Sequence, residues 1–155
     1  MENRLEILRA EIDRLIGEGN PEKVRYFASH LYGVSKFCVL LAKKRGFCPE
    51  LAATAGMLHD IYQVTSGISE NHAAEGAKVA DKMLRAVGLY SDDEIAVITT
   101  AISRHSDKTM VHQPFDELLK DADVMDHCFY NPGFPVVGHE ITRYRDILTA
   151  LNMPI

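Results

Sequence analysis

The sequence has no tryptophan, three cysteines and no long hydrophobic run. Its cysteines, Cys38, Cys48 and Cys128, are odd in number and form no CxxC pair. This argues against a zinc ribbon or a disulfide framework, and it predicts reduced thiols in a cytoplasmic protein. The longest strongly apolar run, "FCVLLA", is far too short to span a bilayer. The charged, amphipathic start "MENRLEILRAEIDRL" does not fit a signal peptide.

A surplus of basic residues is also missing, since the formal net charge is -5. Proteins that bind nucleic acids or anionic membranes usually carry a basic patch. The only basic cluster, residues 43–45, lies near an expected helix end, where cations complement the helix dipole. We therefore expect neither a nucleic-acid polymer nor a membrane as partner. The oligomeric state stays open, because the amphipathic first helix can cover its own core or meet a partner.

Alternating strand-like runs are missing as well, and the spacing of apolar residues is helical nearly everywhere. The chain of 155 residues has no Pro/Ser-rich linker and no clear repeat. We predict an all-α fold and a single domain over residues 1–155. Helix start and stop signals divide this domain into several expected helices. Examples are Asn20-Pro21, Gly88 and the capping box from Ser91 to Glu94. The expected helices cover residues 1–19, 20–45, 49–61, 69–88, a stretch from 91 onward, 114–130 and 138–151.

The helix expected at residues 49–61 differs from its neighbours, because residues 51–58 include no charged side chain. A helix that is apolar on all sides is a buried, central helix. Its small residues would let other helices approach closely. His59 and Asp60 follow this stretch directly, and an ionised carboxylate in a core needs a partner or a metal. The alternative is a helix that surfaces at His59 and leaves both side chains in water.

Three further helices place a histidine on their apolar face. His30 shares a stripe with Phe27 and Val34, His72 lies on the face of Gly76, and His105 continues a row of isoleucines. One inward histidine is more often a satisfied core residue than a ligand. Four imidazoles and a carboxylate from several helices instead favour a metal site of the kind built between facing helices. The remaining histidines, His112, His127 and His139, lack such support and are interpreted as surface or loop residues.

The helix at residues 114–130 adds Asp121, Asp123 and Asp126. Helical phase points Asp126 most nearly inward and leaves Asp123 at the edge of the apolar face. Periodicity alone does not choose among the three carboxylates.

Together, "SH" at residues 29–30, "LHD" at 58–60 and "KDAD" at 120–123 resemble the HD-domain metal-dependent phosphohydrolase superfamily. The resemblance covers about residues 20–130 and implies a compact helical bundle around a central buried helix. It also selects Asp123 over Asp126. The ligands that it implies for one metal are His30, His59, Asp60 and Asp123. His72 and His105 resemble the extra histidines of members that bind two metals, and Asp60 would bridge the two positions.

Such a site suits one or two divalent transition-metal ions, Mn, Fe, Co, Ni or Zn, better than Mg or Ca. Asp60 is the predicted catalytic residue, placed to hold the attacking water. We expect hydrolysis of a phosphate ester or anhydride, with a nucleotide or another small phosphorylated metabolite as substrate. Two alternatives stay open. One is a di-iron oxygenase of the kind that myo-inositol oxygenase represents, and the other is a non-catalytic regulatory or binding module.

One position departs from the resemblance. Many relatives, the HD-GYP branch above all, carry a lysine three residues after the aspartate, where this chain has Gln63. The chain also lacks the GYP motif, so hydrolysis of cyclic dinucleotides is not expected. A phosphate contact must then come from elsewhere, and Arg104 and Lys108, which flank His105, are the predicted substrate-binding residues. The alternative for both is an ordinary solvated helix end.

Overall fold

The computed structural model describes residues 3–155, which form eight α-helices, two short 3₁₀ helices and no β-strand. The predicted all-α class is confirmed; the first two positions of the expected N-terminal helix lie outside the described residues. The helices are α1 (Arg4–Glu18), α2 (Val24–Arg45), α3 (Pro49–Leu58), α4 (Ile61–Ser66), α5 (His72–Val87), α6 (Asp92–Arg104), α7 (Pro114–Tyr130) and α8 (Ile141–Ala150), with 3₁₀ helices η1 (Pro21–Lys23) and η2 (Gly138–Glu140).

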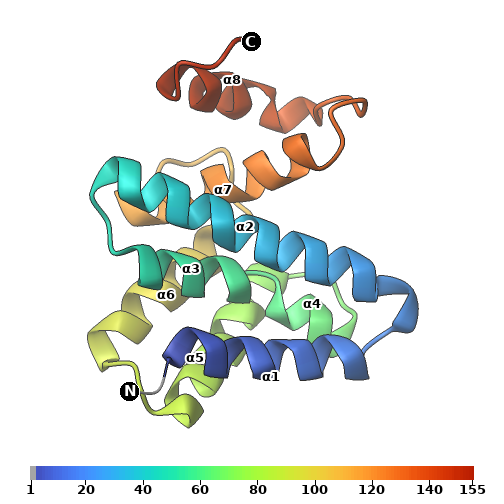
Figure 1. Cartoon of the computed structure of the whole chain (residues 1–155), viewed down its shortest axis with the longest axis vertical. Helices are drawn as coiled ribbons and strands as arrows, with labels where there is room; N and C mark the ends of the chain where they lie inside the picture. The colour runs from blue at the N-terminus through green and yellow to red at the C-terminus, as the bar shows by residue number, and fades with distance from the viewer. Residues whose placement is uncertain (1–2) are drawn as a thin grey trace.

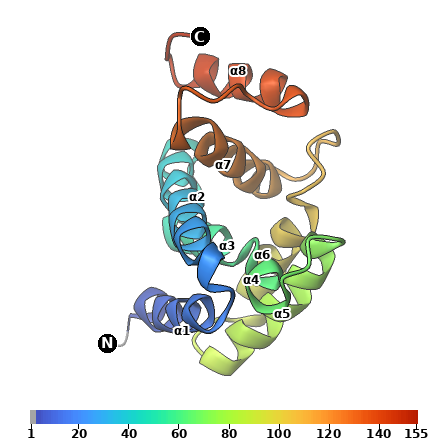
Figure 2. The ribbon, with the colours of Figure 1, turned by 90° about the vertical axis from the view of Figure 1, so that its right-hand side faces the viewer.

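The helices α2, α3 and α7 form the middle of the molecule, with α1 and α8 at opposite ends of its long axis (Figure 1). In the view turned by 90°, α4, α5 and α6 gather on one side of α2 (Figure 2). The α1 helix covers the core with Leu8, Ile12 and Ile16, which are buried. Within residues 3–155, no helix combines the length and the apolar character that a membrane crossing requires.

The helix α3 is the central buried element that its composition predicts, since every residue from Ala52 to Leu58 is buried. Its close approach to α2 depends on Gly56. A Cβ atom at that position would lie 2.7 Å from the Cα atom of Ser35. The Ser35 hydroxyl also donates to the carbonyl of Ala53 at 3.1 Å, which ties the two backbones together. This contact holds the end of α3 against α2, the helix that carries His30.

The helix predicted at residues 49–61 ends earlier, at Leu58, and a separate short helix, α4, follows it. In a continued helix, the carbonyl of Gly56 would accept the N–H of Asp60. Here that carbonyl lies 2.7 Å from Nδ1 of the His59 ring. Asp60 leaves helical geometry with φ -108° and ψ 18°, and Gly67 ends α4 in the left-handed conformation. This break turns His59 and Asp60 toward the interior, and α4 extends regular structure into the stretch between the helices expected at residues 49–61 and 69–88.

Other predicted boundaries agree closely with the structure. The helix α2 ends at Arg45, and α7 runs from Pro114 to Tyr130. The capping box is present, because the Ser91 hydroxyl accepts from the N–H of Glu94 and the Glu94 carboxylate accepts from the N–H of Ser91. The helix α5 begins at His72, three residues later than expected, after Asn71 in the left-handed conformation (φ 53°).

Candidate metal centre

Four histidines and two aspartates from separate elements meet in the interior. They come from α2, the turn between α3 and α4, the start of α5, the residue after α6, and α7. Five of the six are nearly inaccessible, with exposed fractions between 0% and 5%: His30, His59, Asp60, His105 and Asp123. The sixth, His72, has 23% of its side chain exposed. The structure thus brings together all six residues that the resemblance implied as ligands.

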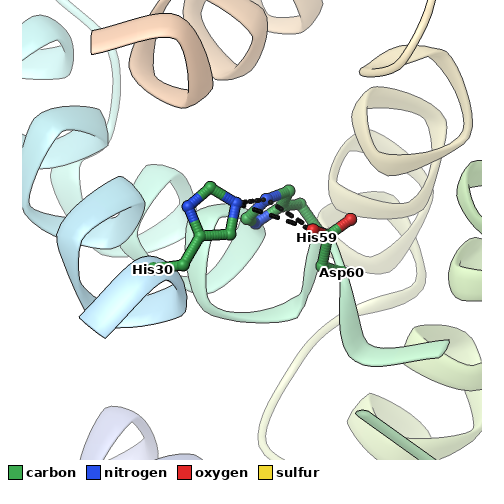
Figure 3. Close-up of side chains that lie close together, drawn as sticks. All are labelled: His30, His59 and Asp60. Carbon is green, nitrogen blue, oxygen red and sulfur yellow. Dashed lines mark hydrogen bonds and ion pairs between the residues drawn. The ribbon is translucent and has the colours of Figure 1, made fainter. Parts of the chain in front are cut away.

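One half of the centre is formed by His30 and His59, which we call the inner pair. Their Nε2 atoms lie 3.1 Å apart, and Figure 3 shows the two rings turned toward Asp60. The Oδ2 atom of Asp60 is 3.5 Å from Nε2 of His30 and 3.6 Å from Nε2 of His59. The Oδ1 atom of Asp123 closes this half at 3.3 Å and 3.6 Å from the same two nitrogens.

The other half is formed by His72 and His105, the outer pair, whose Nε2 atoms lie 3.2 Å apart. The Oδ1 atom of Asp60 is 3.4 Å from each of these nitrogens. Asp60 therefore directs one carboxylate oxygen to the inner pair and the other to the outer pair. This placement would let the one carboxylate contribute to two metal positions.

Hydrogen bonds at Nδ1 orient all four rings. In three of them Nδ1 lies 2.7–2.8 Å from the carbonyl three residues earlier: His59 to Gly56, His72 to Ser69 and His105 to Ile102. In His30 the partner is Oδ2 of Asp126, at 2.7 Å. Because a carbonyl or carboxylate can only accept, Nδ1 carries the proton. A neutral ring then presents its Nε2 lone pair to the centre, as in metal-ligating histidines.

The donor set fits a divalent transition metal. Lone pairs of facing imidazoles repel at 3.1–3.2 Å unless a proton or a metal ion lies between them. Imidazole nitrogens bind such metal ions at about 2.0–2.1 Å, so both nitrogens of a pair could reach one ion. Among residues 3–155, the buried Oδ1 atoms of Asp60 and Asp123 find no hydrogen-bond donor. Buried orphan acceptors of this kind are costly unless a ligand satisfies them.

The charges of the centre are strongly coupled. Burial opposes ionisation of Asp60, yet neighbouring His59 and close contacts with His105 and His30 hold its pKa well below the usual range. Burial also opposes ionisation of Asp123, whose pKa is lowered by Lys108 and by the inner pair. Burial disfavours the protonated form of His30, but the carboxylates of Asp123, Asp126 and Asp60 beside it raise its pKa to about 12. By contrast, burial lowers the pKa of His105. Without metal, His30 therefore retains a second proton at neutral pH.

The two predicted substrate-binding cations lie in different surroundings. The Lys108 Nζ atom donates to Oδ2 of Asp123 at 2.6 Å and to the carbonyl of His105 at 2.9 Å, and only 8% of its side chain is exposed. Arg104 instead pairs with Asp116 at 2.7 Å, with 39% of its side chain exposed. Gln63 accepts a hydrogen bond from the Ser69 hydroxyl at 3.0 Å. It thus supports the loop that precedes His72.

The loop that carries Lys108 is held by a fully buried lysine in the "KDAD" motif. The Lys120 Nζ atom lies 2.8 Å from the carbonyl of Met110, 2.7 Å from Nδ1 of His112 and 2.8 Å from the carboxylate of Glu117. This lysine therefore anchors the connection between α6 and α7 beside the centre. His112 is part of that anchor, on a loop as predicted, and His139 is exposed in η2.

Sequence reasoning missed three contributors to the site. Asp126, which helical phase pointed inward, orients the His30 ring, and Gly33 leaves room for its carboxylate. His127 was interpreted as a surface or loop residue. Its side chain is 38% exposed, but it belongs to α7 and its Nε2 atom lies 3.5 Å from Oδ1 of Asp123. The sequence signal that could have identified His127 is its spacing of four residues from Asp123, which places both on one face of a helix. Glu140, which binds His127, comes from a distant segment that periodicity does not connect to the site.

A pocket of about 550 Å³ opens beside the inner pair. His30, Asp126 and His127 line it next to the centre, and the aromatic rings of Tyr26 and Phe134 belong to its wall. Its remaining lining residues are Glu22, Arg25, Ser29, Tyr130, Pro135, Val137, His139 and Glu140. The pocket therefore combines an apolar, aromatic surface with access to the ligand cluster.

Two comparisons with known proteins agree with this geometry. The model of the HD domain family matches residues 27–130. The fold is similar to the crystal structure, at 1.45 Å resolution, of a predicted HD superfamily hydrolase from an uncultured Thermotogales bacterium, with a TM-score of 0.62 and 20% sequence identity. The similarity covers 97% of this chain and 96% of that one, and at this identity it concerns the fold. Since the family model spans most of the chain and includes the ligand cluster, this protein belongs to the HD domain family.

Proposed function

We propose that this protein hydrolyses a phosphate ester or anhydride of a nucleotide or another small phosphorylated metabolite, using water activated by metal ions. The observation that carries the proposal is the position of Asp60, with one oxygen 3.4 Å from each nitrogen of the outer pair and the other 3.5–3.6 Å from the inner pair. The bound ions would supply a nucleophilic hydroxide at neutral pH and an electrophile for the phosphoryl oxygens.

The chain's own residues divide the remaining work. His30, His59 and Asp123 would hold one metal position, His72 and His105 the other, and Asp60 both. The ionised state of Asp60, which its neighbours favour, would let it contribute to both metal positions and keep the attacking water oriented. This role makes Asp60 the catalytic residue of the proposal.

Lys108 is the cation that we propose for phosphate binding. Its ammonium group already lies 2.6 Å from Asp123, so a phosphate oxygen entering the centre would find it within reach. Arg104 pairs instead with Asp116, which belongs to none of the potential ligand groups found in the described residues, so it is the weaker of the two predicted contacts. The exchange of Asp123 for phosphate would let Lys108 neutralise charge that develops during hydrolysis.

The pocket beside the inner pair suits the part of the substrate that does not react. Its aromatic residues, Tyr26, Tyr130 and Phe134, offer flat surfaces for a planar ring. Tyr26 lies parallel to the His30 ring within 19°, with centroids 5.5 Å apart. A nucleobase or another ring system could therefore lie in the pocket while its phosphate reaches the centre.

The test begins with metal analysis of the purified protein, followed by a screen of phosphorylated compounds with Mn²⁺, Co²⁺, Ni²⁺ and Mg²⁺. We expect release of phosphate or of a phosphorylated product, and its loss in Asp60→Ala and Lys108→Ala. Full metal content and activity in Asp60→Ala would contradict the assignment. Iron-dependent O₂ consumption with a mixed-valent di-iron EPR signal would favour the oxygenase, and protein that stays free of metal in metal-replete medium would favour a binding module.

A further inference from the structure

We propose that His127, oriented by Glu140, is an additional protein ligand of the metal held by His30 and Asp123. This inference rests on the proposed metal-dependent function, and it adds a residue to the set that the family resemblance implies. The carrying observation is a second triad on the pocket side of the centre. One ligand atom each from His30, Asp123 and His127 lies within 4.8 Å of the other two.

The position of the His127 ring supports this role. Its Nε2 atom lies 3.5 Å from Oδ1 of Asp123, the buried oxygen that finds no hydrogen-bond donor among residues 3–155. The ring is parallel to that of His30 within 4°, and the two centroids are 5.0 Å apart. Asp123 and His127 are four residues apart on α7, so one face of the helix presents both to the centre.

Glu140 orients the His127 ring in the way that carboxylates orient metal-ligating histidines. Its Oε1 atom lies 3.1 Å from Nδ1 of His127, and the residue is only 3% exposed. A carboxylate can only accept, so it places the ring proton on Nδ1 and leaves the Nε2 lone pair for the centre. Carboxylate–histidine–metal arrangements of this kind fix both the tautomer and the ring orientation. Asp126 does the same for His30, at 2.7 Å.

Exposure distinguishes His127 from the other ligands. Its side chain is 38% exposed and lines the pocket, whereas that of His30 is 3% exposed. A ligand at the pocket mouth can leave the metal when a substrate oxygen arrives, because water can replace its contacts there. His127 would therefore fill a coordination position in the free protein that the substrate occupies during the reaction.

The experiment measures Co²⁺ binding by titration and by visible absorption, in the full-length protein at one pH. The variants are His127→Ala, His127→Gln, Glu140→Gln and His59→Ala. His139→Ala is the matched control, because His139 lines the same pocket but joins no potential ligand group found in the described part of the chain. Thermal unfolding in EDTA identifies any variant that does not fold. Where His127→Ala does not fold, His127→Gln provides the test in its place.

We expect His127→Ala to weaken Co²⁺ binding by about tenfold or more and to change the absorption spectrum, because a ligand is lost. Added imidazole should restore both, Glu140→Gln should have a smaller effect, and His139→Ala should match the wild type. Wild-type affinity, or an unchanged spectrum, in both His127 variants would overturn the inference while leaving the proposed function intact. If His59→Ala also binds Co²⁺ normally, the metal centre itself is contradicted.

Discussion

The inner and outer pairs present the same atoms to Asp60 but are supported differently. His30 lies within the long helix α2, and its ring is oriented by a carboxylate. His72 is the first residue of α5, follows a residue with φ 53°, and is oriented by a backbone carbonyl. The inner pair thus consists of two buried histidines, whereas the outer pair depends in part on His72, whose side chain is 23% exposed. We therefore expect metal to leave the outer pair first as the free metal concentration falls.

The largest effect should come from the residue that the two halves share. Asp60→Ala removes a ligand from both positions, so metal content should fall to near zero and hydrolysis by about a thousandfold or more. Elemental analysis after gel filtration and an assay on the best substrate measure the two quantities. Asp93→Ala, which removes an exposed carboxylate on α6, is the control and should behave as the wild type. Loss from only one position would show that Asp60 does not bridge.

The second prediction compares how the metal affinity of the inner pair and that of the outer pair depend on pH. Hydrogen bonds to carboxylates overcome burial and raise the pKa of His30 to about 12, so metal must displace a proton at the inner pair. Its affinity should rise about tenfold per pH unit, or about 100-fold between pH 7 and pH 9. Burial lowers the pKa of His105, so that ring is already neutral at pH 7 and displaces no proton. Metal affinity at the outer pair should therefore rise less steeply with pH than at the inner pair over this range.

Titrations of His72→Ala and His30→Ala isolate the inner and the outer pair respectively. Equal slopes of log affinity against pH in the two variants would contradict the assignment of the proton to the inner half. A steeper slope in His30→Ala would instead assign the displaced proton to the outer pair.

The third prediction concerns the carboxylate that orients His30. Asp126→Asn keeps the size of the side chain but removes the charge that fixes the Nδ1 proton. Inner-pair affinity should fall by about 10–100-fold, as for other outer-shell partners, with the outer pair unchanged. Isothermal titration in the His72→Ala background measures the change, with Asp146→Asn on the exposed face of α8 as control. An equal loss at both pairs would point to general destabilisation instead.

The smallest effect should be on stability. Gly56→Ala places a methyl group 2.7 Å from the Cα atom of Ser35, so α2 and α3 must move apart. Overpacking of this kind costs about 1–3 kcal/mol in the free energy of unfolding. The control is Gly17→Ala in α1, where a Cβ meets no described atom within 4 Å and alanine should stabilise the helix by about 0.5–1 kcal/mol. Urea unfolding compares them, and a Gly56→Ala protein as stable as the wild type would contradict the close contact.

Much of the fold was predictable because residues close together in the sequence indicate which helix is buried and where a helix begins. The uncharged stretch of residues 51–58 identified the central helix, and Ser91 with Glu94 located the start of α6. The break after Leu58 was not predictable, because it involves the His59 ring and the carbonyl of Gly56 in a fully packed interior. A pattern of apolar spacing does not contain such a contact.

The candidate site was likewise predictable only in part. Helical phase turned His30, His72 and His105 inward, but it left Asp123 and Asp126 unresolved because both contribute: one faces the centre and the other orients His30. His127 was missed because its support comes from Glu140, across a loop of irregular structure. Contacts between distant segments of this kind arise only from the tertiary fold.

Anomalous diffraction from crystals of the Mn²⁺-loaded protein tests the central claim most directly. We expect two peaks about 3.5–4 Å apart, one at the inner pair and one at the outer pair, with Asp60 between them. A metal-saturated crystal with no peak within bonding distance of Asp60 would contradict that claim.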